Sequence, residues 1–180
     1  MDFSTVHYLN VFLGLGAIGL QILIVFTLSL LFFSRGENKF LSFVKQHFIA
    51  LGFFLSLAPM LFSLFYSEIL NYAPCYHCWI QRIFLFPQIF LFGVAWLRKD
   101  RNIYFYSLPL LLAGLLDALY LNYLYYFNPN SAPCDASGVS CVQRMVSEFG
   151  GYISIPMLAL TSFVSLITIV LVAHFYQKED

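Results

Sequence analysis

Hydrophobic residues along this chain gather into five long runs that short polar stretches separate. The runs cover residues 9–33, 47–70, 79–97, 103–127 and 153–175. A helix needs about 20 mostly apolar residues to cross the hydrocarbon of a membrane, and each run is about that long. Because hydrocarbon offers the backbone no hydrogen-bond partners, we expect each run to be helical. The pattern therefore predicts an all-α integral membrane protein with five transmembrane helices.

The composition agrees with a membrane protein, since 61% of the 180 residues are hydrophobic and 10% are charged. A soluble domain carries roughly a quarter charged residues. The connections leave no room for a separate soluble domain, so we expect residues 1–180 to form one membrane domain. The formal net charge is zero, which gives no reason to expect nucleic-acid binding. No Lys or Arg precedes the first run and no small-residue cleavage site follows it, so we expect a retained helix rather than a signal peptide.

The basic residues in the connections predict how the chain crosses the membrane. Seven of the nine Lys and Arg residues fall on one side of the predicted spans: Arg35, Lys39, Lys45, Arg98, Lys99, Arg101 and Lys178. By the positive-inside rule this side faces the cytoplasm. We therefore expect a multi-pass protein of the bacterial inner (plasma) membrane, with its N-terminus outside, its C-terminus in the cytoplasm, and outer loops at 71–78 and 128–152.

All four cysteines lie on the predicted outer side, in two pairs. Cys75 and Cys78 precede the third run, and Cys134 and Cys141 lie in the 128–152 loop. Disulfides persist outside the bacterial cytoplasm, whereas cytosolic thiols are kept reduced. Two pairs on one oxidising face indicate disulfides or disulfide chemistry.

The first pair belongs to the segment "NYAPCYHCWIQR", which leads directly into the third run. Pro74 suits a turn or the first helical position. Cysteines at the start of a helix meet unpaired backbone N–H groups and the positive end of the helix dipole, which favour a thiolate. Arg82 lies four residues after Cys78, on the same helix face, and helical side chains lean toward the N-terminus. We expect its guanidinium to reach back toward the Cys78 sulfur, so that the pair is poised to react.

Other interpretations of the first pair stay open. The two cysteines fit a structural disulfide. A zinc site built from all four cysteines fits less well, because six residues separate Cys134 from Cys141. We therefore expect no metal ion. A c-type haem needs C-x-x-C-H, whereas Trp79 follows Cys78, and a thioredoxin site needs a βαβ setting that this chain lacks. We expect His77 to be an interfacial side chain, with proton handling as the alternative, and Gln81 to be an interfacial or packing residue.

Ser, Gly, Asp and Pro surround the second pair in "SAPCDASGVSCVQR", a composition that is typical of an exposed loop. A disulfide across six residues closes a small ring and stabilises a fold only modestly. An exposed disulfide is readily reduced, which suits a catalytic role. After the pair, hydrophobic residues recur at helical spacing and predict a short interfacial helix: Val142, Met145, Val146 and Phe149.

Two disulfide-capable pairs on one face indicate an electron relay. Thiol–disulfide exchange moves electrons from a partner's dithiol to the loop pair and then to the Cys75–Cys78 pair. An acceptor must reoxidise this last pair, and its position at the edge of the membrane favours a lipid-soluble acceptor. A quinone fits, because its ring can approach Cys78 from the bilayer while Arg82 stabilises negative charge that develops on a ring oxygen.

The segments "FYSEILNYAPCYHCWIQRIFLFP", "APCDASGVSCVQR" and "GGYISIPMLAL" resemble the DsbB disulfide-bond formation family, and in particular its BdbC-like branch. The resemblance covers about residues 51–171. It rests on C-x-x-C-W-x-Q-R entering a helix, on a C-x6-C loop, and on a glycine and "IP" that open the last run. The vitamin K epoxide reductase family shares the chemistry, but its loop pair precedes the C-x-x-C, which comes first here.

The resemblance implies a four-helix transmembrane bundle that binds a quinone, either ubiquinone or menaquinone, near the outer surface. It also implies a quinone-dependent thiol oxidase that reoxidises a DsbA-like thioredoxin-fold protein and so supports disulfide bond formation. Cys78 would then contact the quinone with Arg82 as its electrostatic partner, and Cys75 would exchange with the loop pair. Cys134 would be attacked by the thioredoxin-fold partner, and Cys141 would resolve the mixed disulfide.

Two features depart from the family pattern. The first run is additional to the usual four helices, and we expect it to pack against them or to dock a partner. Its Gly14, Gly16 and Gly19 suit close helix contact. Relatives tend to carry a histidine in the helix before the loop cysteines, whereas "LLDALYLNYL" has none.

Asp117 lies in the middle of the fourth run, where an ionisable residue is costly and usually functional. We consider two roles for it. One is quinone binding or proton transfer, which groups Asp117 with Cys78 and Arg82 as candidate cofactor-binding residues. The other is structural pairing with Gln21, Gln88 or another polar group within the membrane.

Two rival functions also stay open. One is a non-enzymatic membrane protein, such as a transporter subunit, whose outer loops are held by two structural disulfides. The other is a reductase that runs the same relay backwards, because the direction of electron flow depends on redox potentials that an amino-acid sequence does not specify.

Overall fold

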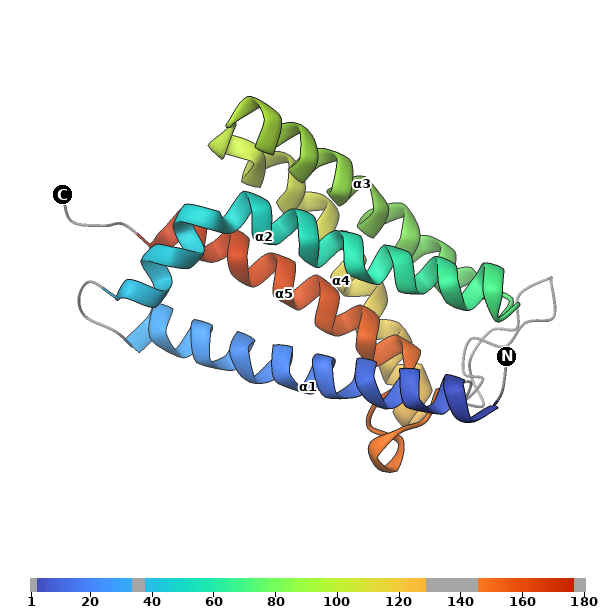
Figure 1. The fold of residues 1–180 in the computed structure, drawn as a ribbon. Helices are drawn as coiled ribbons and strands as arrows, with labels where there is room; N and C mark the ends of the chain where they lie inside the picture. The colour runs from blue at the N-terminus through green and yellow to red at the C-terminus, as the bar shows by residue number, and fades with distance from the viewer. Residues whose placement is uncertain (1–2, 34–37, 129–145, 177–180) are drawn as a thin grey trace.

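Five long helices joined by short connections make up the part of the chain that the structure describes. The computed structural model describes residues 3–33, 38–128 and 146–176. The long helices are α1 (Phe3–Phe33), α2 (Lys39–Leu64), α3 (Tyr76–Arg98), α4 (Tyr104–Phe127) and α5 (Ile155–Phe175) (Figure 1). A π-helical turn, η1 (Phe65–Ile69), continues α2, and the 3₁₀ turns η2 (Arg101–Ile103) and η4 (Phe149–Gly151) precede α4 and α5. Each long helix is apolar enough to cross a membrane, which confirms the five predicted spans.

Some helices extend beyond the apolar runs that predicted them. α2 begins at Lys39 rather than at residue 47, and α3 begins at Tyr76 rather than at residue 79. At the start of α2 the Asn38 side chain accepts a hydrogen bond from the Phe40 N–H at 2.9 Å and so caps a first turn that is partly polar. The hydrophobic pattern marks the apolar part of each helix, whereas capping residues set where the helix starts.

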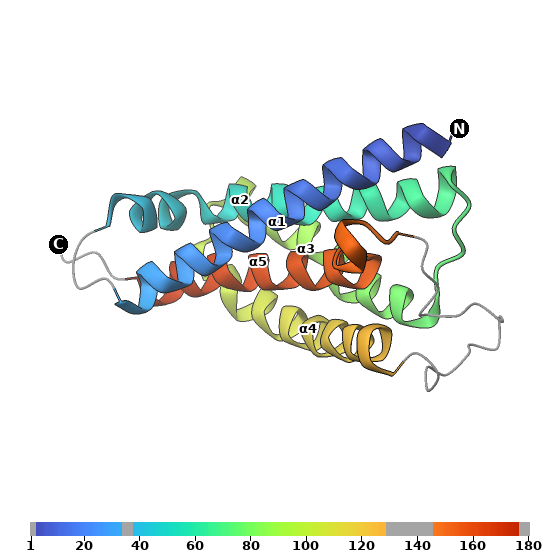
Figure 2. The ribbon, with the colours of Figure 1, turned by 90° about the horizontal axis from the view of Figure 1, so that it is seen from below.

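Helices α2 to α5 form a bundle, and α1 lies against the outside of it (Figure 1, Figure 2). In the bundle α2 packs against α3 and α5, and α4 packs against the same two helices. α1 packs mainly against α5 and touches α2 little. The predicted four-helix bundle with one additional N-terminal helix is therefore confirmed.

Two glycines bring helices of the bundle into close contact. A Cβ atom at Gly52 of α2 would overlap the ring of Phe92 in α3, and one at Gly114 of α4 would overlap the ring of Phe163 in α5. Both rings are completely buried. Small residues matter for packing in lipid, because lipid chains are as apolar as the side chains and only a close fit favours contact between helices.

Polar side chains fix α1 on the bundle. Gln21 donates a hydrogen bond to the Thr161 hydroxyl of α5 at 2.8 Å. The Tyr66 hydroxyl of η1 donates a hydrogen bond to the Asn10 side chain. In hydrocarbon such bonds are retained because water is not there to replace them. These bonds fix α1 at Asn10, in its first half, and at Gln21, near its middle.

Only one of the three glycines expected to bring α1 close to its neighbours does so. A Cβ atom at Gly14 would lie 2.7 Å from the ring of Phe149 in η4. A Cβ atom at Gly16 or Gly19 would meet nothing within 4 Å. The expectation of close helix contact is therefore wrong for Gly16 and Gly19.

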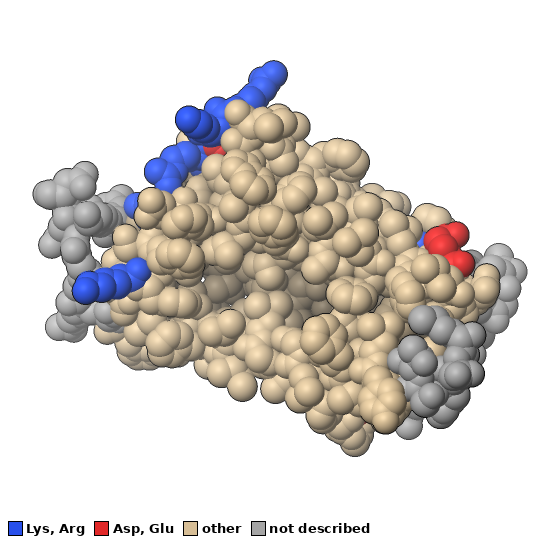
Figure 3. Space-filling model, viewed as in Figure 1, with Lys and Arg blue, Asp and Glu red and all other residues tan. Residues whose placement is uncertain are grey.

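The basic side chains gather at one end of the molecule (Figure 3). Apart from Arg82, the described Lys and Arg residues belong to the first turns of α2, the end of α3 or the turn η2: Lys39, Lys45, Arg98, Lys99 and Arg101. Since Cys75 and Cys78 lie at the other end of α3, the cysteine pair and the basic residues are separated by the length of that helix. The charge asymmetry of the sequence is therefore also an asymmetry of the folded molecule.

Two expectations fall on residues 129–145, which lie outside the described residues. They are the loop pair Cys134 and Cys141 and the first half of the interfacial helix expected over 142–149. The second half of that segment contains no α-helix, because residues 146 and 147 have no regular structure and Glu148 pairs with Ile153 in an isolated bridge. The turn η4 lies between these bridge partners, and the positive φ of its two glycines allows the tight reversal.

Candidate active site

The N-terminus of α3 brings Cys75 and Cys78 together. Cys75 is the N-cap residue, and its sulfur accepts a hydrogen bond from the Cys78 N–H at 3.3 Å. The two sulfur atoms lie 2.8 Å apart. The C-x-x-C spacing explains this contact, because residues three apart on a helical turn lie on the same face. The helix N-terminus also places positive partial charge beside both sulfur atoms, as expected for reactive cysteines.

Arg82 lies one helical turn below Cys78 and is only 9% exposed. Its described hydrogen bonds go to α2 and η1 rather than to the Cys78 sulfur. Nε and Nη2 donate to the hydroxyl and carbonyl oxygens of Ser63 and to the hydroxyl of Ser67, at 2.9–3.0 Å. The guanidinium carbon also lies 5.2 Å from the centroid of the Trp79 ring. These contacts fix the positive charge, and none of the hydrogen bonds among the described residues uses Nη1.

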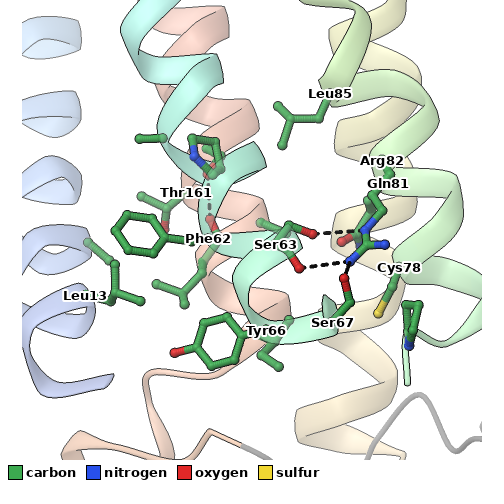
Figure 4. Close-up of a pocket in the computed structure, with 18 of the residues that line it drawn as sticks. Leu13, Phe62, Ser63, Tyr66, Ser67, Cys78, Gln81, Arg82, Leu85 and Thr161 are labelled. Atoms are coloured by element: carbon green, nitrogen blue, oxygen red, sulfur yellow. Dashed lines mark hydrogen bonds between the residues drawn. The ribbon is translucent and has the colours of Figure 1, made fainter. Parts of the chain in front are cut away.

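A cavity of about 390 Å³ joins Cys78 and Arg82. It is lined by α1, α2, α3 and α5, together with η1 and the connection that precedes α3. Most of the lining residues are apolar, and the polar side chains of Ser63, Ser67 and Gln81 lie beside Arg82 (Figure 4). A mostly apolar cavity of this size with a few convergent polar groups is typical of a small-molecule binding site.

Gln81 contributes an unpaired hydrogen-bond donor to the cavity lining. The residue is 6% exposed, and its Nε2 atom is buried without a hydrogen-bond partner among the described residues. A buried donor without a partner costs about 1–3 kcal/mol, so such donors are rare unless a ligand satisfies them. Gln81 is therefore a buried residue rather than one exposed at the interface, and a ligand oxygen in the cavity would satisfy this donor.

A second polar pair links α3 to α4 beside the cysteines. His77 Nδ1 lies 2.7 Å from Asp117 Oδ1, and the two side chains are 9% and 12% exposed. The expectation that His77 is an interfacial side chain is therefore wrong. The Oδ2 atom of Asp117 is buried and has no hydrogen-bond partner among the described residues. The carboxylate of Asp117 thus contacts His77, which is one of the two residues between Cys75 and Cys78.

Asp117 is not among the residues that line the cavity with Cys78 and Arg82. The two glutamines considered as its structural partners bond elsewhere, Gln21 to Thr161 and Gln88 to Ser107. A structural partner of Asp117 is instead His77. A role of Asp117 in proton transfer stays a prediction.

The structure thus groups Cys75, Cys78 and Arg82 at one end of α3, as the sequence predicts. The two serines that hold Arg82 and the unpaired amide of Gln81 were not expected at the site. Ser63 and Ser67 are four residues apart, and this helical spacing of two hydroxyls near the end of an apolar run is a signal that could have identified them. The remaining predicted site residues, Cys134 and Cys141, lie outside the described residues.

A family model described as disulfide bond formation protein DsbB matches residues 45–173 of the chain. The matched range contains α3, α4 and most of α2 and α5, and it leaves α1 outside. No solved structure matches the chain.

Relatives from Bacillus carry corresponding names. The chain is 30% identical over 140 residues to the "Probable disulfide formation protein C 2" of Bacillus anthracis, a match that covers 78% of this chain and 99% of the relative. It is 38% identical over 121 residues to the "SPbeta prophage-derived disulfide bond formation protein B" of Bacillus subtilis (strain 168), with 67% and 80% covered. It is 35% identical over 123 residues to the "Disulfide bond formation protein C" of the same organism, with 67% and 87% covered.

Proposed function

The chain belongs to the DsbB disulfide bond formation family, and on this basis we propose that it is a quinone-dependent thiol oxidase. It is a multi-pass membrane protein and an oxidoreductase of disulfide bond formation. We propose that it reoxidises a DsbA-like thioredoxin-fold protein outside the cytoplasm and passes the electrons to a membrane quinone. The observation that carries the proposal is the cavity that Cys78, Gln81 and Arg82 share.

The proposed relay transfers two electrons at each step. Oxidation of the partner's dithiol releases two electrons and two protons, which reduce the Cys134–Cys141 disulfide to two thiols. These thiols then reduce the Cys75–Cys78 disulfide by the same exchange. A quinone would be the final acceptor of the two electrons and two protons. In this scheme the partner's thiolate attacks Cys134 and releases Cys141 as a thiolate. The partner's second thiol then resolves the mixed disulfide, because attack by Cys141 would only re-form the Cys134–Cys141 disulfide.

The cavity residues fit a quinone, which is an apolar ring with two carbonyl acceptors. Gln81 offers a buried donor that has no partner among the described residues, and Arg82 offers Nη1. The bonds from Arg82 to Ser63 and Ser67 hold its charge in place, so it can stabilise negative charge on a carbonyl oxygen without reorganising. We therefore assign Gln81 and Arg82 to quinone binding.

The two cysteines of the C-x-x-C segment have different surroundings, and we propose different roles for them. Cys78 lines the cavity, whereas Cys75 is not among the lining residues and packs against Leu121 of α4. Cys78 would therefore be the sulfur that delivers electrons into the cavity, and Cys75 the sulfur that exchanges with the loop pair. Asp117 and His77 would handle protons next to them.

We propose that the cysteine end of the molecule faces the outside of the cell. Apart from Arg82, the described basic side chains lie at the other end of the bundle, and the positive-inside rule assigns that end to the cytoplasm. This orientation exposes the relay to the compartment in which disulfides persist.

A quinone-reduction assay on the purified full-length protein tests the proposal. A reduced thioredoxin-fold donor is mixed with the protein and with decyl-ubiquinone or menadione, and the absorbance of the quinone is followed. We expect the wild type to reduce quinone in a donor-dependent reaction, and we expect Cys75→Ser and Cys78→Ser to reduce none. A wild type that reduces no quinone would contradict the proposal. If the serine variants then lost only stability, the two cysteines would be structural.

Gln81→Met keeps every cysteine and removes the unpaired donor at nearly constant volume. We expect the KM for quinone to rise about fivefold, because a neutral hydrogen bond is worth about 1 kcal/mol. Stoichiometric disulfide exchange with the donor should not change.

The direction of electron flow is tested with the wild type. If it transfers electrons from quinol to the donor's disulfide faster than from the donor's dithiol to quinone, the protein is a reductase instead.

A further inference from the structure

The helix α1 lies outside the part of the chain that matches the family, yet it forms one wall of the cavity that contains Cys78. The residues of α1 that line the cavity are Phe12, Leu13, Gly16, Ala17 and Leu20. Their spacing of three and four residues places them on one face of the helix. The additional helix therefore encloses a site whose reactive side chains come from α3.

We propose that this face of α1 binds the hydrocarbon tail of the quinone and that Gly16 sets the width of the tail site. The inference rests on the proposed function and deepens it. Cys78, Gln81 and Arg82 lie on the α3 side of the cavity, whereas α1 contributes only apolar residues, among them Leu13 on the opposite side (Figure 4). A membrane quinone has the same asymmetry, because a polar ring is joined to a hydrocarbon tail. The ring therefore binds beside α3, and the tail extends toward α1.

The attachment of α1 leaves room for a tail. Hydrogen bonds fix Asn10 to Tyr66 and Gln21 to Thr161, and the lining residues of α1 lie between these two anchors in the sequence. Over its whole length α1 packs mainly on α5 and makes little contact with α2. The cavity lies between α1 and α2, because residues of both helices line it.

Gly16 keeps this space wide. It lines the cavity, and a Cβ atom there would meet nothing within 4 Å. Gly14 differs, because a Cβ atom there would lie 2.7 Å from the Phe149 ring, so the absence of a side chain at Gly14 serves packing. At Gly16 the absence of a side chain serves no contact among the described residues and increases the space available to a ligand.

Gly16→Leu and Gly19→Leu form a matched pair of variants. Both glycines lie in the interior of α1 with open space around a new Cβ atom, but only Gly16 lines the cavity. Binding of decyl-ubiquinone to the full-length protein in detergent is measured from quenching of tryptophan fluorescence, with no thioredoxin-fold protein present. Trp79, which lies beside Arg82, is a suitable reporter. We expect Gly16→Leu to weaken binding about tenfold, because the added side chain overfills the tail site, and Gly19→Leu to leave binding unchanged.

Menadione, which has a quinone ring without a tail, separates ring binding from tail binding. We expect menadione to bind the wild type and both variants equally. An equal loss of menadione and decyl-ubiquinone binding in Gly16→Leu would show that α1 contacts the ring, which overturns the proposal. Equal decyl-ubiquinone binding by Gly16→Leu and Gly19→Leu would also overturn it, and would leave a lipid acyl chain as the occupant of the space.

Two further measurements keep the result interpretable. Stoichiometric oxidation of a reduced thioredoxin-fold donor by the quinone-free protein reports whether each variant is folded with working cysteine pairs. If the leucine variants fail to fold, Gly16→Ala and Gly19→Ala repeat the comparison, with a smaller loss expected at Gly16 alone. A wild type that binds neither quinone overturns the proposed function itself, whereas a wild type that binds both, with no difference between the two glycines, overturns only the role of α1.

Discussion

His77 and Asp117 are two polar side chains that pair across the contact between α3 and α4. A carboxylate within a transmembrane span has no water to solvate it, so it binds another polar group. Asp117 binds His77, and His77 stands between the two cysteines that gain and lose protons as they exchange electrons. The pair thus connects an ionisable group of α4 to the reacting segment of α3.

Asp117→Asn is expected to slow quinone reduction about 100-fold, because the variant lacks the carboxylate that would accept a proton through His77. The amide still offers His77 a hydrogen-bonding oxygen, so the fold should persist. Oxidation of the thioredoxin-fold donor by the quinone-free protein should proceed as in the wild type. Stopped-flow absorbance measures the first rate, and trapping of donor thiols measures the second.

Asp100→Asn is the matched control for this variant. Asp100 lies at the basic end of the molecule and accepts a hydrogen bond from the Asn102 N–H at 2.9 Å, and an asparagine caps a helix about equally well. We expect this variant to keep both rates. If quinone kinetics were unchanged in Asp117→Asn as well, the pair with His77 would be structural.

At the scale of the helices, close packing between α2 and α3 sets how Ser63 and Ser67 meet Arg82. Gly52 lets the two helices approach at the buried Phe92, and the serines lie farther along the same helix pair. Wider spacing between α2 and α3 would therefore withdraw the hydroxyl groups that hold the guanidinium. The geometry of the site depends on packing that is several turns away from it.

Gly52→Ala is expected to lower the free energy of unfolding by about 2 kcal/mol, because its Cβ atom would overlap the buried ring of Phe92. Gly93→Ala is the control: its Cβ atom would make an ordinary contact with Phe53 at 3.5 Å, and it should gain up to about 1 kcal/mol from helix propensity. Thermal unfolding in detergent measures both. Equal stability of Gly52→Ala and the wild type would show that Phe92 can move aside.

Comparison of the helices with the apolar runs shows which helix bounds a local sequence pattern predicts. Each apolar run became a helix, because a backbone in hydrocarbon must bond to itself. The start of α2 was displaced from its predicted position, because Asn38 caps a partly polar first turn that hydropathy does not recognise. After residue 145 the predicted helical spacing gave way to a bridge and the turn η4, where Gly150 and Gly151 adopt conformations that a helix excludes.

At the scale of the whole molecule, the basic end and the cysteine end determine its orientation in the membrane. In a chain whose own cysteines are replaced by serine, Ala73→Cys and Arg98→Cys place one exposed thiol at each end. We expect a membrane-impermeant maleimide to label the thiol at position 73 on intact cells and the thiol at position 98 only after the membrane is opened. The opposite labelling would place the relay in the cytoplasm, where thiols are kept reduced, and would exclude the proposed direction of electron flow.

The amino-acid sequence sufficed to predict the membrane class, the five spans and the contact between Cys75 and Cys78. These features are local. The hydrophobicity of a run decides whether it enters lipid, and a spacing of three residues on a first helical turn decides which sulfurs meet. The separation of the Cys75–Cys78 pair from the basic residues of the two connections at the other end follows as well, because helices that cross the membrane in turn place alternate connections on opposite sides.

Packing between helices was needed to find the serines that hold Arg82, the unpaired donor of Gln81, the pair of His77 with Asp117 and the wall that α1 adds to the cavity. Transmembrane helices are apolar on every side, because lipid covers each surface that another helix does not. Hydrophobic periodicity therefore does not reveal which face turns inward. Both Gly16 and Gly19 lie within the same apolar run, so the sequence does not distinguish them. Gly16 lines the cavity because of the way α1 is rotated against α5.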